Sequence, residues 1–164
     1  MGKWQLTLII TGRTLISLFF IFSAVNKILD WTESERALTN VFCDWQAYTA
    51  SSVFWQQFFS FFMQWAWAVL AGLIVLELLA GIFLLCGYKV KAAASFLILF
   101  MLCMTVLLHH FWFLSGEKRD LQLMFFFKNI AILGALFYVS SVDTKKAASG
   151  FGGMSLSKLS DPFK

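Results

Sequence analysis

The chain has 164 residues, of which 60% are hydrophobic, 18% aromatic and only 13% charged, and its formal net charge is +4. Soluble domains are roughly half apolar and a quarter charged. The composition therefore excludes a soluble, disordered or fibrous protein and indicates an integral membrane protein, long enough for about four spans of about 20 residues each. No basic run is interleaved with exposed polar residues, so the sequence predicts no nucleic-acid binding.

Four apolar stretches have the length of a helix that crosses a bilayer. They cover residues 6–28, 65–86, 92–114 and 123–142. We therefore predict an all-α fold, an integral membrane four-helix bundle over residues 1–142, followed by a flexible cytoplasmic tail at residues 143–164. Because Arg13 interrupts the first apolar run, we expect an uncleaved first span rather than a signal peptide.

The long segment between the first two stretches, residues 30–64, is predicted to be a loop with a helical end. It opens with acidic residues and ends with Phe54, Phe58, Phe61 and Phe62 at helical spacing. We interpret that aromatic end as an interfacial amphipathic helix that leads into the second span. The alternative is that it continues into the second span as one long tilted helix.

Lysine and arginine predict the orientation of the spans, because they concentrate in cytoplasmic segments. With the N-terminus inside, the cytoplasmic set is Lys3, Lys89, Lys91, Lys145, Lys146, Lys158 and Lys164. The outer set is smaller and consists of Lys27, Arg36, Lys118 and Arg119. We therefore expect both termini in the cytoplasm and the 30–64 loop outside.

Charged residues inside the spans are informative, because an unpaired charge in hydrocarbon costs a few kcal/mol or more. Counted by helix rise, Arg13 and Glu77 both lie roughly 12–13 Å from the cytoplasmic side. We predict a buried ion pair between them, in which the guanidinium donates two hydrogen bonds to the carboxylate. The alternative is that such a pair only fixes the register of the helices.

A second group of polar residues lies nearer the outer face. It consists of Asn26, Lys27, His109, Lys128 and Asn129. We expect His109, Lys128 and Asn129 to line one outer-leaflet cavity, with Asn26 and Lys27 at its rim. The head of a quinone or of a lipid fits such a cavity equally well. The simpler alternatives are that Lys27 extends to the interface and that His109 belongs to an interfacial belt.

Small residues beside the polar ones predict which helix faces meet. On the first span one helical stripe contains Arg13, Ser17, Phe20, Ala24 and Lys27. Glu77 precedes Ala80 and Gly81 by one turn, and Lys128 shares a face with Ala131 and Ala135. Because small residues let helix backbones approach closely, we expect all three charges, on Arg13, Glu77 and Lys128, to point into the bundle.

No intrinsic cofactor and no metal site are predicted. His109 and His110 are adjacent on one expected helix, so they do not ligate one haem from two helices. Zinc needs three or four ligands, but Cys43, Cys86 and Cys103 lie in separate segments. Their spacing indicates neither a disulfide framework nor a dithiol pair.

Five segments carry a combined pattern. They are residues 22–30, with Arg13 before them, residues 77–87, residues 91–94, residues 109–112 and residues 127–134. In this order, the five segments resemble the DoxX family of four-span membrane proteins. Their patterns are Lys-x-x-Asp, Glu followed by two glycines, Lys followed by small residues, His-x-Phe-Trp (here His-His-Phe-Trp) and Phe-Lys-Asn. Ala24 stands where that family usually has glycine.

The resemblance implies a four-helix bundle in a bacterial inner membrane, associated with membrane oxidoreductase complexes such as thiosulfate:quinone oxidoreductase. Relatives in the wider clan serve as cargo receptors or assembly factors. On this basis we expect a quinone-linked subunit in which Lys128, Asn129 and His109 hydrogen-bond to the quinone and Glu77 relays protons. Electrons would come from a redox partner protein. The alternative is a non-enzymatic assembly factor, or a lipid-binding or cargo module, that uses the same cavity.

Overall fold

The computed structural model describes residues 3–141, which form six α-helices, one short 3₁₀ helix and no strand. The elements are α1 (Lys3–Leu29), α2 (Trp31–Tyr48), α3 (Val53–Gln64), α4 (Ala66–Cys86), α5 (Val90–Leu108), η1 (Phe111–Phe113) and α6 (Gly116–Ser141). The predicted all-α fold is confirmed. The predicted tail lies outside the described residues.

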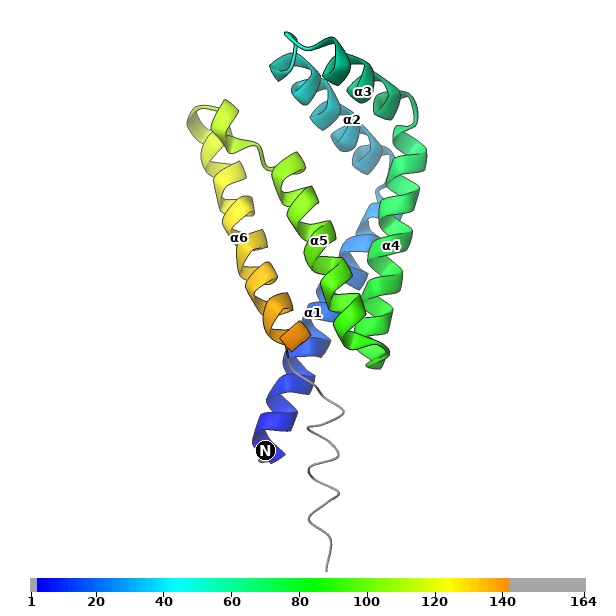
Figure 1. The fold of residues 1–164 in the computed structure, drawn as a ribbon, viewed down its shortest axis with the longest axis vertical. Helices are drawn as coiled ribbons and strands as arrows, with labels where there is room; N and C mark the ends of the chain where they lie inside the picture. Colours follow the sequence, from blue (N-terminus) through cyan, green and yellow to red (C-terminus); the bar gives the residue numbers. More distant parts are fainter. Residues whose placement is uncertain (1–2, 142–164) are drawn as a thin grey trace, which may run out of the picture.

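Four of these helices are long and apolar enough to cross a membrane, namely α1, α4, α6 and the segment of α5 with η1. They stand side by side as an elongated bundle (Figure 1). The protein is therefore a multi-pass membrane protein with four candidate spans. The fourth helix begins at Gly116 rather than at residue 123, so it includes a polar first segment, residues 116–122, before the apolar run.

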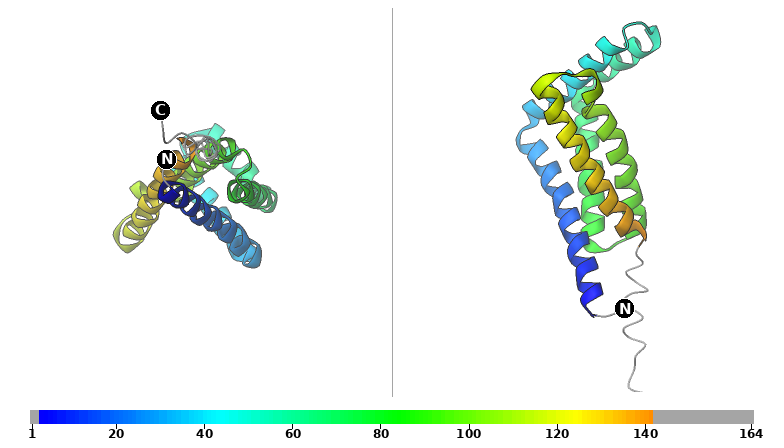
Figure 2. Two further views of the ribbon diagram at one scale, coloured as in Figure 1. Left: turned by 90° about the horizontal axis from the view of Figure 1, so that it is seen from below. Right: turned by 90° about the vertical axis from the view of Figure 1, so that its left-hand side faces the viewer.

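The segment expected to be a loop is almost entirely helical. The predicted aromatic helix is present as α3, but the acidic part before it is a second helix, α2. The two form an antiparallel hairpin that projects from one end of the bundle (Figures 1 and 2). The alternative of one long helix is wrong, because the backbone at Trp65 (φ −109°, ψ 22°) leaves the helical region between α3 and α4.

Two clusters of buried side chains hold these parts together. One lies within the bundle and includes Phe20, Leu84, Leu97 and Leu136. The other joins the hairpin to α1 and α4 and includes Ala24, Leu38, Phe42, Phe59, Leu70 and Ile74. The hairpin is therefore packed onto the bundle and is not an independent appendage.

The α1 and α4 backbones approach each other closely at Gly81. A Cβ atom added to Gly81 would lie 3.1 Å from Ile21 Cγ1 and 3.5 Å from the Ile21 backbone nitrogen. On the α1 side, Ser17, Phe20 and Ala24 are completely buried. The predicted stripe of small and polar residues on α1 thus does face the bundle, and glycine at position 81 lets the two backbones approach.

Gly87 ends α4 with a left-handed backbone (φ +70°) and lies directly against Arg13. The Gly87 and Tyr88 amides donate to the carbonyl oxygens of Leu84 and Phe83, which closes the last turn of the helix. A Cβ atom at Gly87 would lie 3.2 Å from Nη1 of Arg13. This position therefore needs glycine both for its φ angle and for the contact with Arg13.

We predict that Gly87→Ala lowers the free energy of unfolding by about 1–2 kcal/mol, because a side chain in the left-handed region is strained. Thermal denaturation of the detergent-solubilised protein measures the change. Gly134→Ala on α6 is the matched control, since an added Cβ atom there meets no atom within 4 Å. Equal effects of the two substitutions would contradict this assignment.

Candidate functional site

Glu77 forms an ion pair with Lys27 near the middle of α4. Lys27 Nζ lies 2.8 Å from Oε2 of Glu77 and also donates to Oγ of Ser23 at 2.6 Å. The Glu77 side chain is 4% exposed and the Lys27 side chain 30% exposed. The pair therefore neutralises a buried carboxylate, while the lysine remains partly accessible from outside the protein interior.

This partner differs from the predicted one. Arg13 does not pair with Glu77; its guanidinium lies against Gly87, at the opposite end of α4 from the hairpin. There a positive charge is favourable, because the helix dipole places partial negative charge at the end of α4. Nε of Arg13 is buried without a hydrogen-bond partner among the described residues.

The error came from the assumption that the ends of the two spans are level. The beginning of α1 extends beyond the other helices of the bundle (Figure 1). This displacement puts Arg13 level with the last residue of α4 and brings Lys27, about 21 Å further along α1 by helix rise, to Glu77. Glu77 is thus in a buried ion pair, but its partner is Lys27 and not the predicted Arg13.

Lys27 lines a cavity of about 320 Å³, here called the polar cavity. Its wall is mostly apolar, and its polar lining residues are Lys27, Ser34, His109 and Gln122. The other lining residues are Ala37, Leu38, Val41, Leu70, Leu73, Met104, Leu108 and Phe125. This cavity at the hairpin end of the bundle brings together two of the five predicted residues, Lys27 and His109, and α2 supplies one of its walls.

His109 enters this cavity because α5 ends at Leu108, so the His109 backbone (φ −114°, ψ 60°) is no longer helical. Its Nδ1 atom lies 2.7 Å from Oε1 of Gln122. An amide oxygen only accepts hydrogen bonds, so Nδ1 carries the proton and Nε2 of the neutral ring is an acceptor. The sequence did not single out Gln122, which lies one residue before the expected fourth span.

The remaining predicted site residues do not line the cavity. Lys128 is exposed on α6, and its Nζ lies 4.9 Å from the ring centroid of Phe125, which is part of the cavity wall. Asn129 is buried on the neighbouring face of α6 and Asn26 is exposed on α1. The expectation that Lys128 points into the bundle with Ala131 is therefore wrong.

The physical reason is the rotation of α6. Its buried face consists of Asn129, Leu133, Leu136 and Val139. Lys128 is one residue away from this face, and one residue turns a helix by about 100°. Lys128 thus lies beside the cavity, behind the ring of Phe125, and not inside it.

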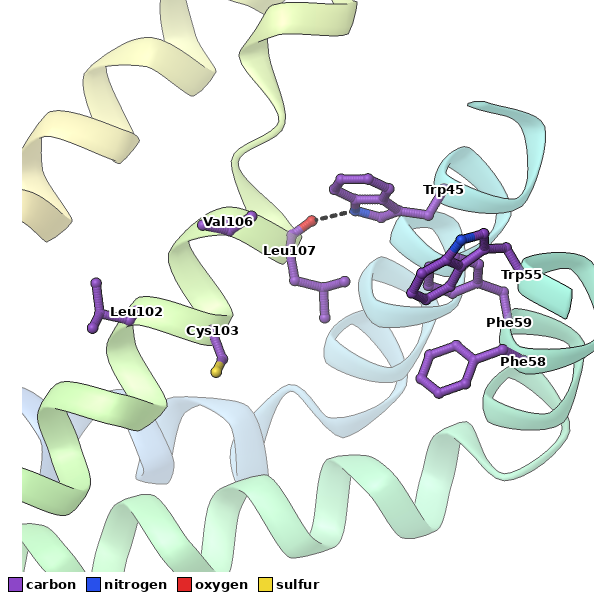
Figure 3. Close-up of a pocket in the computed structure, with 8 residues that line it drawn as sticks. All are labelled: Trp45, Trp55, Phe58, Phe59, Leu102, Cys103, Val106 and Leu107. Atoms are coloured by element: carbon purple, nitrogen blue, oxygen red, sulfur yellow. Dashed lines mark hydrogen bonds between the residues drawn. The ribbon is translucent and has the colours of Figure 1, made fainter. Parts of the chain in front are cut away.

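Between the α2–α3 hairpin and α5 lies a larger hollow of about 500 Å³, here called the aromatic groove (Figure 3). It is lined by Trp45, Trp55, Phe58, Phe59, Leu102, Cys103, Val106 and Leu107. Trp45 Nε1 donates a hydrogen bond of 2.8 Å to the Leu107 carbonyl oxygen, which has lost its helical partner at the end of α5. This bond ties the hairpin to α5.

His110 reinforces the same attachment and has no place in the polar cavity. Its ring is buried between Trp45 and Tyr48, with centroid distances of 5.9 and 5.7 Å, and its Nε2 lies 3.5 Å from Oδ2 of Asp44. The two adjacent histidines thus have different surroundings. Within residues 3–141, no three histidine, cysteine or acidic side chains gather as metal ligands.

Comparison with known proteins gives one family and one partial relative. The model of the DoxX family matches residues 8–110, which is more than half of the chain. The chain is also 34% identical over 80 residues to the ER-derived vesicles protein ERV29 of Saccharomyces cerevisiae. That alignment covers 44% of this chain and 26% of the yeast protein, so the chain spans only about a quarter of its relative. No solved structure matches.

We predict that Lys27→Ala and Glu77→Ala are coupled, with an interaction free energy of about 0.5–3 kcal/mol, because each single change leaves the other charge without its partner. A double-mutant cycle of thermal stability in detergent measures this. Arg13→Ala combined with Glu77→Ala is the control cycle and should be additive. If Arg13→Ala and Glu77→Ala were coupled while Lys27→Ala and Glu77→Ala were additive, Arg13 rather than Lys27 would be the partner of Glu77.

Proposed function

This protein belongs to the DoxX family, and on that premise we propose that it binds the polar head of a membrane amphiphile, a quinone, in the polar cavity. The observation that carries the proposal is the convergence of Lys27 and His109 on one mostly apolar hollow. Pockets that bind small molecules are typically apolar, with a few polar groups that orient the ligand.

The hydrogen-bonding groups of the cavity match both redox forms of a quinone. Lys27 already makes two short hydrogen bonds, and its third N–H has only a 3.5 Å contact with the Ser23 carbonyl oxygen. That N–H would be donated to a quinone oxygen. His109 Nε2 would accept a hydrogen bond from a quinol hydroxyl, since the bond from Nδ1 to Gln122 fixes the tautomer.

Within this proposal the roles of the originally expected residues change. His109 is the nearest proton acceptor for a bound quinol, and Glu77 contacts the ligand only through Lys27. Glu77 would therefore relay protons as the partner of Lys27. Lys128 lies over the Phe125 ring, outside the cavity lining, and takes no part in binding. Asn129 takes no direct part.

We further propose that the protein is a membrane subunit of a quinone-linked oxidoreductase system in a bacterial inner membrane, with both termini in the cytoplasm. Electrons would come from a separate redox partner. The hairpin would offer that partner an aromatic surface, since Phe54 is 65% and Phe61 58% exposed on α3.

The second candidate function is non-enzymatic: a lipid-binding, cargo or assembly module that uses the hairpin to hold another membrane protein. Two observations support it. The α2–α3 hairpin projects beyond the bundle (Figure 2), and the partial similarity is to an ER-derived vesicles protein. In this case the protein would co-purify with a membrane client and would show no affinity for quinones.

We predict that His109→Leu weakens the binding of decylubiquinone, a short-chain quinone, by about two- to tenfold, the equivalent of one hydrogen bond. Gln122→Leu should weaken it less, because it only releases the His109 ring. Quenching of tryptophan fluorescence in detergent gives the dissociation constants.

Lys128→Met is the control for this series, since it removes a polar side chain beside the cavity but outside its lining. Its dissociation constant should stay within about a factor of two of the wild-type value, which is less than one hydrogen bond contributes. Unchanged affinity in a folded His109→Leu variant, or no quinone binding by the wild type, would refute the quinone proposal.

Orientation has its own test, with the exposed thiol of Cys43 on α2. We expect a membrane-impermeant maleimide added to intact cells to label Cys43 in a Cys86→Ser, Cys103→Ser background, because the proposed orientation puts the hairpin on the outer side. A cysteine introduced at Lys89 in a chain without other cysteines should react only after the cells are permeabilised. Labelling of the Lys89→Cys variant in intact cells would show that the orientation is the opposite of the proposed one.

A further inference from the structure

A third hollow lies on the outside of the bundle between α4 and α5, at the end opposite the hairpin. It has a volume of about 250 Å³, and we call it the α4–α5 groove. Its walls are apolar and include Leu79 and Phe83 from α4 with Ala92 and Phe96 from α5. Lys89, in the turn between the two helices, is the one charged residue that lines it. This groove is separate from the polar cavity and does not depend on the quinone proposal.

The position of the groove makes its walls face the hydrocarbon of the membrane. Leu76, Leu79 and Phe83 are 45%, 48% and 42% exposed, although α4 is a candidate span. Ala92 has only a methyl group, so the surface between the larger side chains is hollow. The hollow therefore offers an apolar surface to the acyl chains of the surrounding lipids.

The charge at the mouth of the groove selects the head group. Lys89 is exposed and lies beside the exposed aromatic ring of Tyr88, a pairing that is typical of the membrane–water interface. Arg13 lies against Gly87 in the same turn. Lys91, the second residue of α5, carries a further positive charge near this turn.

The acidic residues of the described chain lie elsewhere. Glu77 is buried in its ion pair within the bundle. The others are Asp30, Glu33, Glu35, Asp44, Glu117 and Asp120, which belong to the hairpin end (Figure 1). Among residues 3–141, Lys89, the charged residue that lines the groove, forms no ion pair with any of these carboxylates.

We propose that the α4–α5 groove is a binding site for an anionic phospholipid. One acyl chain occupies the hollow between Phe83 and Phe96, and the phosphate of the head group contacts the ammonium of Lys89. The acyl chain makes apolar contacts with the groove. Lys89 gives the preference for a negatively charged head group, since basic residues near a membrane surface attract anionic lipids.

Native mass spectrometry of the full chain in detergent tests the proposal, with phosphatidylglycerol and phosphatidylcholine of identical acyl chains as probes. The wild type should retain phosphatidylglycerol more strongly. Lys89→Asn should weaken phosphatidylglycerol binding by about five-fold and leave phosphatidylcholine binding unchanged, the contribution of one basic residue. Asparagine is chosen because it tolerates the positive φ of 43° at this position. The matched charge control is Lys118→Asn at the hairpin end.

A second variant tests the apolar part independently. Ala92→Leu fills the groove from an exposed position and does not overpack the core, so it should weaken the binding of both lipids. Ser95→Leu, on an exposed position outside the groove, is its control and should weaken neither. Because Ala92→Leu retains Lys89, it keeps the proposal testable even if Lys89→Asn fails to fold.

Four results would overturn the proposal. The first is equal retention of the two lipids by the wild type, and the second is an equal effect of Lys89→Asn and Lys118→Asn. The third is competition by glycerol phosphate at the concentration of the lipid, which would show a simple anion site. The fourth is a dimer in the same spectra that Ala92→Leu converts to monomer, which would show that a second copy of the chain occupies the groove.

Discussion

The ion pair between Lys27 and Glu77 is the constraint on which the arrangement of the spans depends. A carboxylate buried in an apolar bundle requires a partner, and Lys27 near the end of α1 supplies it at 2.8 Å. This contact fixes how far α1 is displaced along α4, and Gly81 permits the close approach. The same displacement carries Arg13 to the end of α4. Because the Lys27 ammonium also borders the polar cavity, one interaction determines both the helix register and a donor of the candidate site.

The helix α2, which the sequence did not predict, is the second feature that shapes the site, because it lines both the polar cavity and the aromatic groove. Its Ser34–Val41 face closes the polar cavity, whereas Trp45 on the next turns belongs to the aromatic groove. The bond from Trp45 Nε1 to the Leu107 carbonyl oxygen stabilises the end of α5. Since His109 follows directly after that end, the attachment of the hairpin also positions the histidine. The hairpin therefore forms part of the site as well as an exposed surface.

The acidic residues of the described chain lie toward the hairpin, and the basic residues occur at both ends of the bundle, so the two proposed binding regions have different electrostatic surroundings. Acidic residues and the polar cavity lie toward the hairpin, whereas Arg13, Lys89 and Lys91 lie at the other end. A neutral head group that exchanges hydrogen bonds suits the first region, because Lys27 is already neutralised by Glu77. An anionic head group suits the second, where Lys89 forms no ion pair with a carboxylate of residues 3–141.

Hydropathy, length and helical period are local properties, so they predicted the membrane class, the four candidate spans, the aromatic helix and the buried stripe of Ser17, Phe20 and Ala24 directly from the amino-acid sequence. It also identified Glu77, Lys27 and His109 as informative, since polar groups in hydrocarbon are costly wherever the chain places them. Only the tertiary structure decided which groups meet. The partner of Glu77 depends on the displacement of α1, the exposure of Lys128 on the rotation of α6, and the role of Gln122 on where α5 ends. These are relations between distant segments, and the packing of side chains determines them. Depths counted from the ends of the apolar stretches do not reveal how far one helix is displaced or rotated relative to another.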